Sequence, residues 1–513
     1  MIPSENRFAL RRNCGLGLLY LIIGMVCSAR DHTDANWDLQ NYHLYGPSAA
    51  LNGRLGSDYF VAGFQGYFNP LADFPYYIAK FILFPAHPFL VAILAGLPFG
   101  LLVFIVFKMA RIFLAQGALW EAALAAFLGL TGATTLSEVG TSFDDILIAD
   151  ILLLGLLVAS RGWGGLARCN YLAGLAAGCA AGLKFTAVIF APGLLVFCLM
   201  QEQDWRLACA TVLRFGVAFA VGFAALWGWW GEMLWRHFHN PFFPLFGSIF
   251  PSIWVPPVNA SDPRFLPRNS WQWLFYPFFW LNDQSFIVSE EKLKDPRFAL
   301  AYLALAVRSC PIFWRGTDRP SRMVLGLWGF FVVSYCLWLI GFSILRYAIA
   351  LEVLSGILIW TALRPLFPGK SVLALGVICL GCYAYTKPMG WGRIRFTEAL
   401  VEAPIPVVPP GSVVFMQGRP LGFVVPCLYR TGTAFILLDG PWPDSAVFST
   451  VQKRVANPQN IFLLTDLVQS QAMAASINAQ LGGFDLIYHE ASCMPVRSAV
   501  QRTIRICSVD RRA

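Results

Sequence analysis

The sequence predicts an all-α polytopic membrane protein of about eleven transmembrane helices, followed by a small α/β domain outside the membrane. Three observations support this fold class. Of the 513 residues, 57% are hydrophobic and only 13% are charged, whereas globular domains carry about 25% charged residues. Apolar runs of helical length recur from residue 14 to residue 386. From residue 404 onward they give way to short runs of β-type sequence.

The composition argues against two classes of function. The net charge of +9 would suggest nucleic acid in a soluble domain, but in a membrane protein the placement of Lys and Arg matters more than their sum. We therefore expect no nucleic-acid partner. The spacing of the 13 cysteines resembles no zinc or haem site. Cys493 and Cys507 fall in the polar C-terminal region, where they can pair in an oxidising compartment or stay free.

The placement of charge predicts the topology, because Lys and Arg gather in cytoplasmic loops. The first apolar run follows Arg7, Arg11 and Arg12, has no cleavage site, and is expected to span the membrane with its N-terminus in the cytoplasm. Further basic groups stand at residues 108–111, 161–168, 206, 315–322 and 364–370. Acidic residues, among them Asp295, collect in outer loops over residues 30–75, 137–144 and 236–297.

The apolar stretch from Tyr171 to Met200 carries Lys184 at its middle. A single helix here would place a charge near the bilayer centre, at a cost of about 2.5–3.5 kcal/mol or more. A single helix would also place the later Lys- and Arg-rich loops on the outer side and the later acidic loop in the cytoplasm. We therefore predict two short arms that meet at Lys184 on the outer side. Such short arms imply a thinned or protein-lined cavity around the lysine.

The C-terminal region reads as a separate domain. Four β-type runs, "GSVVFMQ", "TAFILLDG", "NIFLLTD" and "FDLIYHE", accompany a helical run, "SQAMAASINAQLGG", that ends at glycine. We predict a transmembrane domain over residues 1–403 and an outer α/β domain over residues 404–513. The outer domain has no glycine-rich phosphate loop, so it is interpreted as an accessory cap.

The first outer loop, "WDLQNYHLYGPSAALNGRLGSDYF", is unusually polar for a segment beside a membrane. Asp38 and Tyr42 are four residues apart and share one face of a short helix, and His43 follows. A carboxylate here can serve as a general base or hold a metal ion. The alternative is that Asp38 caps the helix that follows it, a task that Asn36 or Asp34 can equally perform.

This loop resembles the first outer loop of the GT-C superfamily of integral-membrane glycosyltransferases. The polyprenyl-phosphate-mannose-dependent mannosyltransferases and the aminoarabinose and protein-mannosyl transferases are the similar groups. "SEVGTSFDDILIADILLLGLL" resembles their second acidic loop, and "GLAAGCAAGLKFTAVIFAP" resembles their hairpin with a lysine at its tip. "HNPFFPLFGS" and "SILRYAIALEVL" resemble the entry to the large outer loop and a late Arg-Tyr helix. The first loop lacks the adjacent acidic pair seen in several of these families, so Asp34 and Asp38 both remain candidates, with "DLQNY" favouring Asp38.

The resemblance implies transfer of a sugar, with inversion, from a polyprenyl-phosphate carrier to a hydroxyl of a glycan, lipid or protein at the outer face. Asp38 is the candidate base, and cations are expected to stabilise the leaving phosphate. The candidate catalytic residues are Asp38, Asp34, Asp144 and Asp145. The candidate substrate-binding residues are Tyr42, His43, Glu138, Lys184, His237, His239, Arg346 and Tyr347. No cofactor is expected with certainty, and a divalent cation remains open at Asp144 and Asp145. The resemblance also implies the inner membrane of a bacterium.

Each assignment has a structural alternative. Asp144 or Asp145 can cap the helix that begins there, Lys184 can snorkel to the interface, and Arg346 can anchor to lipid headgroups. The competing functions are a transporter or flippase of lipid-linked sugars and a non-catalytic protein of polysaccharide assembly. A transporter usually shows inverted repeats and broken helices. The two halves of this sequence show no such repeat.

Overall fold

The computed structural model describes residues 4–114, 117–162, 165–256, 262–310, 320–440, 445–456, 460–466, 471–501 and 503–512. The predicted cytoplasmic residues 311–319 lie outside them, as do the side chains of Arg7, Arg11 and Arg12. The chain divides into two compact units. Unit 1 comprises Met1–Asp31, Ala92–Trp227 and Asp262–Trp391, and unit 2 comprises His32–Val91, Gly228–Ser261 and Gly392–Ala513. The domain boundary at residue 404 stays a prediction.

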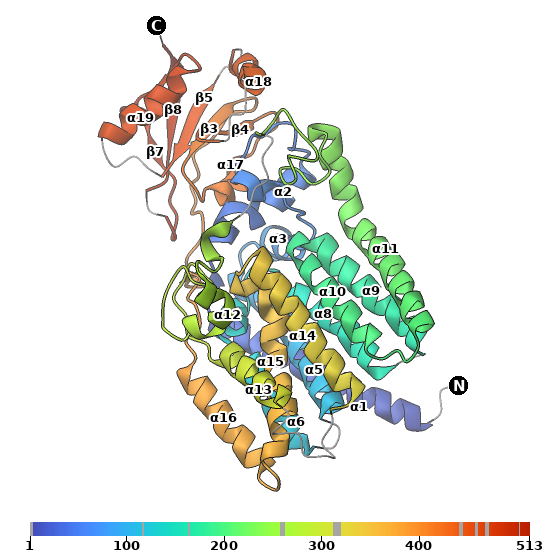
Figure 1. Cartoon of the computed structure of the whole chain (residues 1–513). Coiled ribbons are helices and arrows are strands. Elements are labelled where there is room, and N and C mark those ends of the chain that lie inside the picture. Colours follow the sequence, from blue (N-terminus) through green and yellow to red (C-terminus); the bar gives the residue numbers. More distant parts are fainter. Residues whose placement is uncertain are drawn as a thin grey trace. The chain divides into compact units, whose positions relative to one another are not determined.

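Unit 1 is helical (Figure 1). Its helices are α1 (Ser4–Arg30), α5 (Leu97–Phe113), α6 (Leu119–Leu130), α7 (Ala133–Glu138), α8 (Asp145–Arg161), α9 (Leu166–Leu183), α10 (Phe190–Leu199), α12 (Ser270–Phe279), α13 (Arg297–Ser309), α14 (Arg322–Gly341), α15 (Ile349–Leu363) and α16 (Ser371–Tyr385). Helices α4 (Pro88–Ala95) and α11 (Trp205–Phe238) have residues in both units. The predominantly helical fold class is thus confirmed.

Four helical stretches in the described part of the chain are long and apolar enough to cross a membrane: Pro88–Phe113, Trp205–Phe238, Arg322–Gly341 and Leu345–Leu366. Shorter apolar helices cover Gly17–Arg30, Phe74–Leu83, Leu119–Leu130, Phe185–Leu199 and Ser371–Tyr385. These findings support a polytopic membrane protein. The number of about eleven spans and the orientation of the termini stay predictions.

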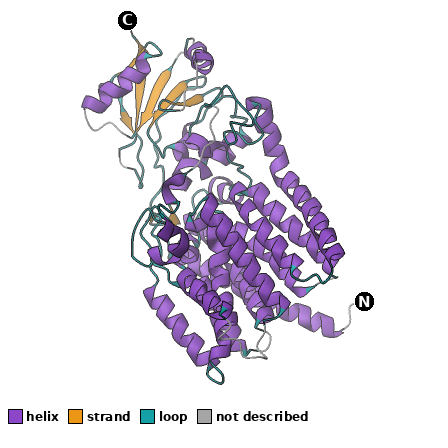
Figure 2. Cartoon of the chain, viewed as in Figure 1, coloured by secondary structure: helices purple, strands orange, loops and turns teal. Residues whose placement is uncertain are grey.

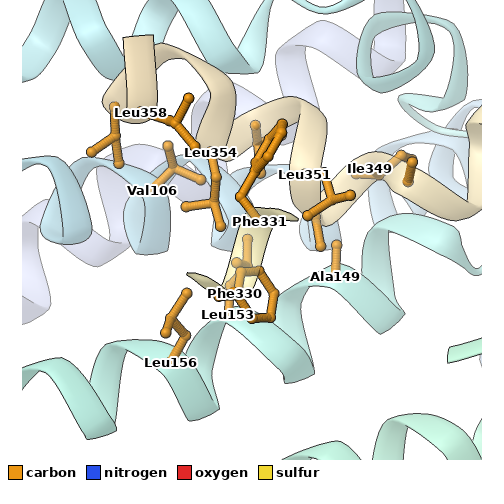
Figure 3. Packing of buried hydrophobic residues seen from close by; sticks show 14 of the residues in the cluster. Val106, Ala149, Leu153, Leu156, Phe330, Phe331, Ile349, Leu351, Leu354 and Leu358 are labelled. Carbon is orange, nitrogen blue, oxygen red and sulfur yellow. The ribbon is translucent and has the colours of Figure 1, made fainter. Parts of the chain in front are cut away.

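The core of unit 1 is a continuous cluster of apolar side chains (Figure 3). Phe330 and Phe331 of α14 lie among residues of α8 and α15, such as Leu153 and Leu354. Inside a membrane, lipid is as apolar as these side chains, so close packing holds the helices together more than the hydrophobic effect does. This core fixes the start of α8, where Asp144 and Asp145 lie, and the start of α15, which follows the 3-10 turn Leu345–Ala348 with Arg346 and Tyr347.

Helix α9 packs closely on α11 through a row of glycines one turn apart. A Cβ added at Gly174 or Gly178 would collide with a backbone carbonyl of α11. Small residues at this spacing let two membrane helices approach closely. Helix α9 then ends at Leu183, and a 3-10 turn over Phe185–Ile189 leads into α10. The predicted break at Lys184 is therefore confirmed.

Unit 2 contains both sheets that the described residues form (Figure 2). Its strands are β1 (Thr33–Asp34), β2 (Arg393–Ile394), β3 (Val413–Gln417), β4 (Ala434–Leu437), β5 (Ile461–Thr465), β6 (Leu486–Tyr488), β7 (Met494–Pro495) and β8 (Arg505–Arg511). Its helices are α2 (Tyr45–Leu51), α3 (Phe74–Ile78), α17 (Val425–Leu428), α18 (Ser445–Val455) and α19 (Gln471–Gly482). The larger sheet has the order β4-β3-β5-β8-β6, with β7 also paired to β8. Strands β4, β3 and β5 are parallel, and β8 is antiparallel to β5.

The predicted strands correspond to β3, β4, β5 and β6, and the predicted helix to α19, so the small C-terminal α/β region is confirmed. Strand β8, which pairs with both β5 and β6, is not among the strands predicted from the sequence. Cys507 of β8 forms a disulfide with Cys493. This closes the question that the sequence left open about these two cysteines.

The first outer loop belongs to the same unit as the large sheet. Tyr59 pairs with the edge strand β4, since its backbone N–H donates to Phe435 and its carbonyl accepts from Leu437. Arg54 forms a buried ion pair with Asp58, whose Oδ1 accepts from the Phe435 backbone N–H at 2.9 Å. The first outer loop is therefore hydrogen-bonded to the edge of the large sheet at β4.

Candidate functional site

Lys184 lies between two carboxylates of unit 1. Its ammonium donates to Asp144 Oδ1 at 2.6 Å and to Asp145 Oδ1 at 2.7 Å. The side chain of Lys184 is 14% exposed, and those of Asp144 and Asp145 are 12% and 4% exposed. A lysine that snorkels to the interface would expose its ammonium. The structure instead holds this ammonium in an ion-paired cluster.

The two aspartates stand where helix α8 begins, yet Asp144 does not cap it. Asp144 occupies the N-cap position, but its side chain makes no cap hydrogen bond. Asp145 is the first helical residue. The helix end thus positions both carboxylates toward Lys184, which itself follows the end of α9.

Glu138 ends the short helix α7 and is only 1% exposed. Neither of its carboxylate oxygens has a hydrogen-bond partner among the described residues. Burial raises the pKa of Glu138 well above its usual range, and the nearby Asp145 raises it further. Arg346 and Lys184 act in the opposite direction. Glu138 therefore interacts electrostatically with the Lys184 cluster, and its two carboxylate oxygens can accept further hydrogen bonds there.

Arg346 is enclosed by aromatic rings. Its guanidinium lies 4.4 Å from the centroid of Phe143, 5.6 Å from that of Trp391 and 5.7 Å from that of Tyr347. The Tyr347 ring also lies 5.1 Å from the Lys184 ammonium. Because Arg346 is 8% exposed, the structure does not present it as a surface anchor for headgroups.

A small cavity opens beside this cluster. Asp145, Lys184, Thr186 and Tyr347 supply its polar lining. The rest of the lining is apolar and comes from Ile148, Ala149, Leu152, Ala187, Phe190, Ile349 and Ala350. The cavity is thus amphiphilic, with a cation at its polar part.

A second buried network braces the segment that leads to Glu138. Glu352 Oε2 accepts from the Thr135 backbone N–H at 2.7 Å, and Glu352 Oε1 accepts from the Thr134 N–H at 3.1 Å. Asp295 Oδ2 accepts from the Ala133 N–H at 2.7 Å and pairs with Arg297. Asp295, which the sequence places in the third outer loop, is fully buried. It is needed there to satisfy the start of α7.

In unit 2, Asn36 caps the turn that was predicted to begin at Asp38. Asn36 Oδ1 accepts from the Leu39 backbone N–H at 2.7 Å, and the Asn36 amide donates to both Asp34 oxygens at 2.9 Å. The turn is a π-helix, Leu39–His43, with Asp38 at its N-cap position but without a side-chain cap hydrogen bond. Asp34 is therefore engaged structurally, and the capping alternative for Asp38 is not what the structure shows.

The next two candidates pack against aromatic and acidic neighbours. His43 is buried, and its Nδ1 lies 2.5 Å from Asp73 Oδ1. The ring of Tyr42 packs against His43, at 4.1 Å between centroids, and contacts Phe68 edge-on. His237 and His239 lie at the end of α11, are both exposed, and belong to unit 2.

The structure thus brings six predicted residues together in unit 1: Glu138, Asp144, Asp145, Lys184, Arg346 and Tyr347. Asp34, Asp38, Tyr42, His43, His237 and His239 belong to unit 2. No sequence pattern singles out Phe143, Thr186 or Trp391. The Trp391 indole donates to the Ser137 hydroxyl at 3.0 Å, which links it to the last turn of α7, next to Glu138. Among the described residues, no group of three or more His, Cys, Asp or Glu side chains is arranged to hold a metal ion.

Fold and site together define a membrane protein with a buried, charged site whose side chains also line a small amphiphilic cavity. No family model matches the chain, and no curated protein matches its sequence. The chain is similar to two solved structures of ArnT from Cupriavidus metallidurans. The structure bound to undecaprenyl phosphate has 13% identity and a TM-score of 0.44, covering 99% of this chain and 98% of that one. The apo structure has 13% identity and a TM-score of 0.43, covering 98% of both chains.

Proposed function

We propose that the protein transfers a sugar, with inversion, from a polyprenyl-phosphate carrier to a hydroxyl acceptor at the outer face of the membrane. The observation that supports this proposal is the cluster that joins the Lys184 ammonium and, through the Tyr347 ring, the Arg346 guanidinium. A lipid phosphate has the matching charge, because a phosphate is stabilised by nearby cations. The GT-C motifs of the sequence support the same reaction.

The leaving group is the carrier phosphate, which requires positive charge more than a general acid. Lys184 and Arg346 supply that charge in unit 1, and Asp144 and Asp145 orient Lys184. Glu138 and Tyr347 supply further polar groups for the sugar or the phosphate. The bond between the anomeric carbon and the phosphate oxygen breaks, and the carrier phosphate leaves with the electron pair.

The acceptor hydroxyl is a weak nucleophile and needs a base within hydrogen-bond reach. Asp38 takes its proton as the new bond to the anomeric carbon forms. This assignment is favoured over Asp34 by the sequence "DLQNY", which places Tyr42 four residues after Asp38. Asp34 itself accepts three hydrogen bonds from Asn36.

The proposed location is the inner membrane of a bacterium, with the N-terminus in the cytoplasm and the C-terminal domain in the periplasm. The Cys493–Cys507 disulfide supports this, because disulfides persist in oxidising compartments such as the periplasm. The charge pattern of the loops supports the same orientation.

The test is release of free polyprenyl phosphate from synthetic polyprenyl-phosphate sugars by the protein in nanodiscs, with membrane-extract acceptors. Asp38→Asn is expected to abolish release while carrier binding is kept. Asp510→Asn, an exposed aspartate of the same unit, is the matched control and should behave as wild type. Carrier binding without release by the wild type would contradict the proposal, and equal release by Asp38→Asn would contradict the base.

A transporter of lipid-linked sugars is the second candidate, favoured by Asp150. This residue lies inside the apolar helix α8, is 1% exposed, and its two carboxylate oxygens have no hydrogen-bond partner among the described residues. Ionisable groups at such positions often line transport pathways. If transport is the function, Asp150→Asn should stop movement of a fluorescent polyprenyl-phosphate sugar across proteoliposomes, while Asp38→Asn should not.

A further inference from the structure

The carboxyl edge of the parallel strands in unit 2 has the topology of a ligand crevice. Strand β3 continues through α17 to β4 on one side, whereas β5 continues through α19 to β6 on the other side. Strands β3 and β5 are neighbours in the sheet. Where the connections of two neighbouring parallel strands diverge, a crevice forms outside their carboxyl ends, and ligands bind there.

Two polar side chains at this edge have oxygens without partners. Gln417 ends β3, is 8% exposed, and its Oε1 has no hydrogen-bond partner in the described part of the chain. Gln417 is directly paired with Thr465, the last residue of β5. Asp466 follows, and its Oδ1 is likewise buried and without a partner among described groups. A buried polar atom is normally satisfied, so two orphans on adjacent strand ends require an explanation.

Gln501 adds a third oxygen of the same kind. Its Nε2 donates to the Pro420 carbonyl at 2.9 Å and to Gln40 Oε1 at 3.1 Å. The Gln40 amide in turn donates to the Ala35 carbonyl at 2.7 Å, which fixes the orientation of both amides. Gln501 Oε1 is therefore assigned as an acceptor, and it is buried without a partner among the residues described.

These contacts connect the sheet edge to the turn that carries the proposed base. Pro420 lies three residues beyond Gln417, and Gln40 lies in the π-helix Leu39–His43, two residues after Asp38. Gly422, in the same connection from β3, packs so closely on the Asn41 carbonyl that a Cβ would collide with it. The carboxyl edge and the Asp38 turn therefore form one local structure within unit 2.

The unpartnered atoms are all oxygens that accept hydrogen bonds, so the ligand must be rich in donors. A phosphate or carboxylate would offer only more acceptors. Two of the three are neutral amide oxygens and only Asp466 is a carboxylate, a set that suits hydroxyl groups better than a cation. From this we infer that the carboxyl edge of β3 and β5, through Gln417, Gln501 and Asp466, binds the hydroxyl groups of a neutral acceptor glycan. The edge presents the glycan next to Asp38, an inference that rests on the proposed function.

Binding of maltotriose, mannotriose and galactotriose to the full chain in nanodiscs, titrated by saturation-transfer NMR, tests the inference. The wild type should bind at least one of them. Gln417→Leu and Gln501→Leu should each weaken that binding about tenfold or more, since each removes an acceptor for a hydroxyl. Gln417→Glu keeps an acceptor at the same position and should retain binding. Gln480→Leu, an exposed position on α19, is the matched control.

Unfolding temperatures of the variants show whether a loss of binding is a loss of fold. No binding of any trisaccharide by the wild type would overturn the inference, as would unchanged binding by both leucine variants. Preferential binding of the triamine spermidine would overturn it too. Because this assay contains no lipid-linked donor, it separates two failures. Trisaccharide binding without any transfer contradicts the proposed function, whereas transfer without trisaccharide binding contradicts this inference alone.

Discussion

Glu352 Oε2 accepts two hydrogen bonds from Thr135, one from its backbone N–H at 2.7 Å and one from its hydroxyl at 2.5 Å. Glu352 lies on α15, and Thr135 lies on α7, the helix that ends in Glu138. A buried carboxylate thus holds the start of a six-residue helix that is too short to be stable by itself. The contact fixes the position of Glu138 without touching it.

We expect Glu352→Gln to destabilise the protein by about 1–3 kcal/mol, because an amide NH₂ would face donors and leave at least one of them unsatisfied. Thermal unfolding in nanodiscs measures this change. Glu291→Gln, an exposed glutamate of the same unit, is the control and should leave the unfolding temperature unchanged. A Glu352→Gln variant as stable as wild type would show that the brace contributes nothing.

Lys184 has a structural role and a proposed binding role, which combined variants separate. Lys184→Met leaves Asp144 and Asp145 as buried carboxylates without their cation, and should cost about 3–5 kcal/mol of stability. Adding Asp144→Asn and Asp145→Asn removes those charges and should restore most of the stability. Binding of undecaprenyl phosphate, measured by native mass spectrometry, should stay lost in the triple variant. Recovery of binding together with stability would contradict the phosphate role of Lys184.

The sequence predicts the break at Lys184 because a charge within a long apolar run leaves few arrangements. It predicts β3 to β6 and α19 because Gly and Asp residues at the ends of these runs mark where each strand or helix begins or ends. Strand β8 is harder to predict. Apolar and polar residues alternate only in part in "RICSVD", and the strand is defined by its antiparallel pairing with β5 and β6. Pairing between distant segments leaves only a weak trace in local sequence.

Some residues of the candidate site can likewise be predicted from the sequence, and others cannot. Lys184, Asp144 and Asp145 stand out as charges at the ends of apolar runs, and the structure joins them. The rings around Arg346 come from Phe143 and Trp391, which are far apart in the sequence, and no spacing relates them. Asp295 is a further example, because this loop acid is buried against Arg297 and the sequence does not indicate that pairing. Burial of a charge depends on a partner that the local sequence does not reveal.

The turn at the first outer loop offers a test of which residue caps it. Asn36→Ala removes the oxygen that accepts from the Leu39 N–H and should cost about 0.5–2 kcal/mol. Asp38→Ala removes no cap hydrogen bond and should therefore destabilise this turn less than Asn36→Ala does. Hydrogen exchange of the Leu39 backbone N–H in the two variants and the wild type measures both effects. The reverse order of the two effects would restore the capping role to Asp38.

The raised pKa of Glu138 should make the free energy of unfolding of the protein depend on pH. Burial, reinforced by Asp145, raises the pKa of Glu138 in the folded protein well above its usual range, while the unfolded chain keeps a value of about 4.3. Below that unfolded pKa both states hold the proton. As pH rises, the unfolded state releases it first, so stability falls until the pH passes the folded pKa.

Glu138→Gln has no proton to release and should lose less stability over this range. The unfolding temperature of both proteins, measured from pH 4 upward in nanodiscs, should therefore diverge in favour of the variant. Parallel curves for the two proteins would mean that Glu138 ionises in the folded state without penalty, and that Lys184 and Arg346 compensate its burial.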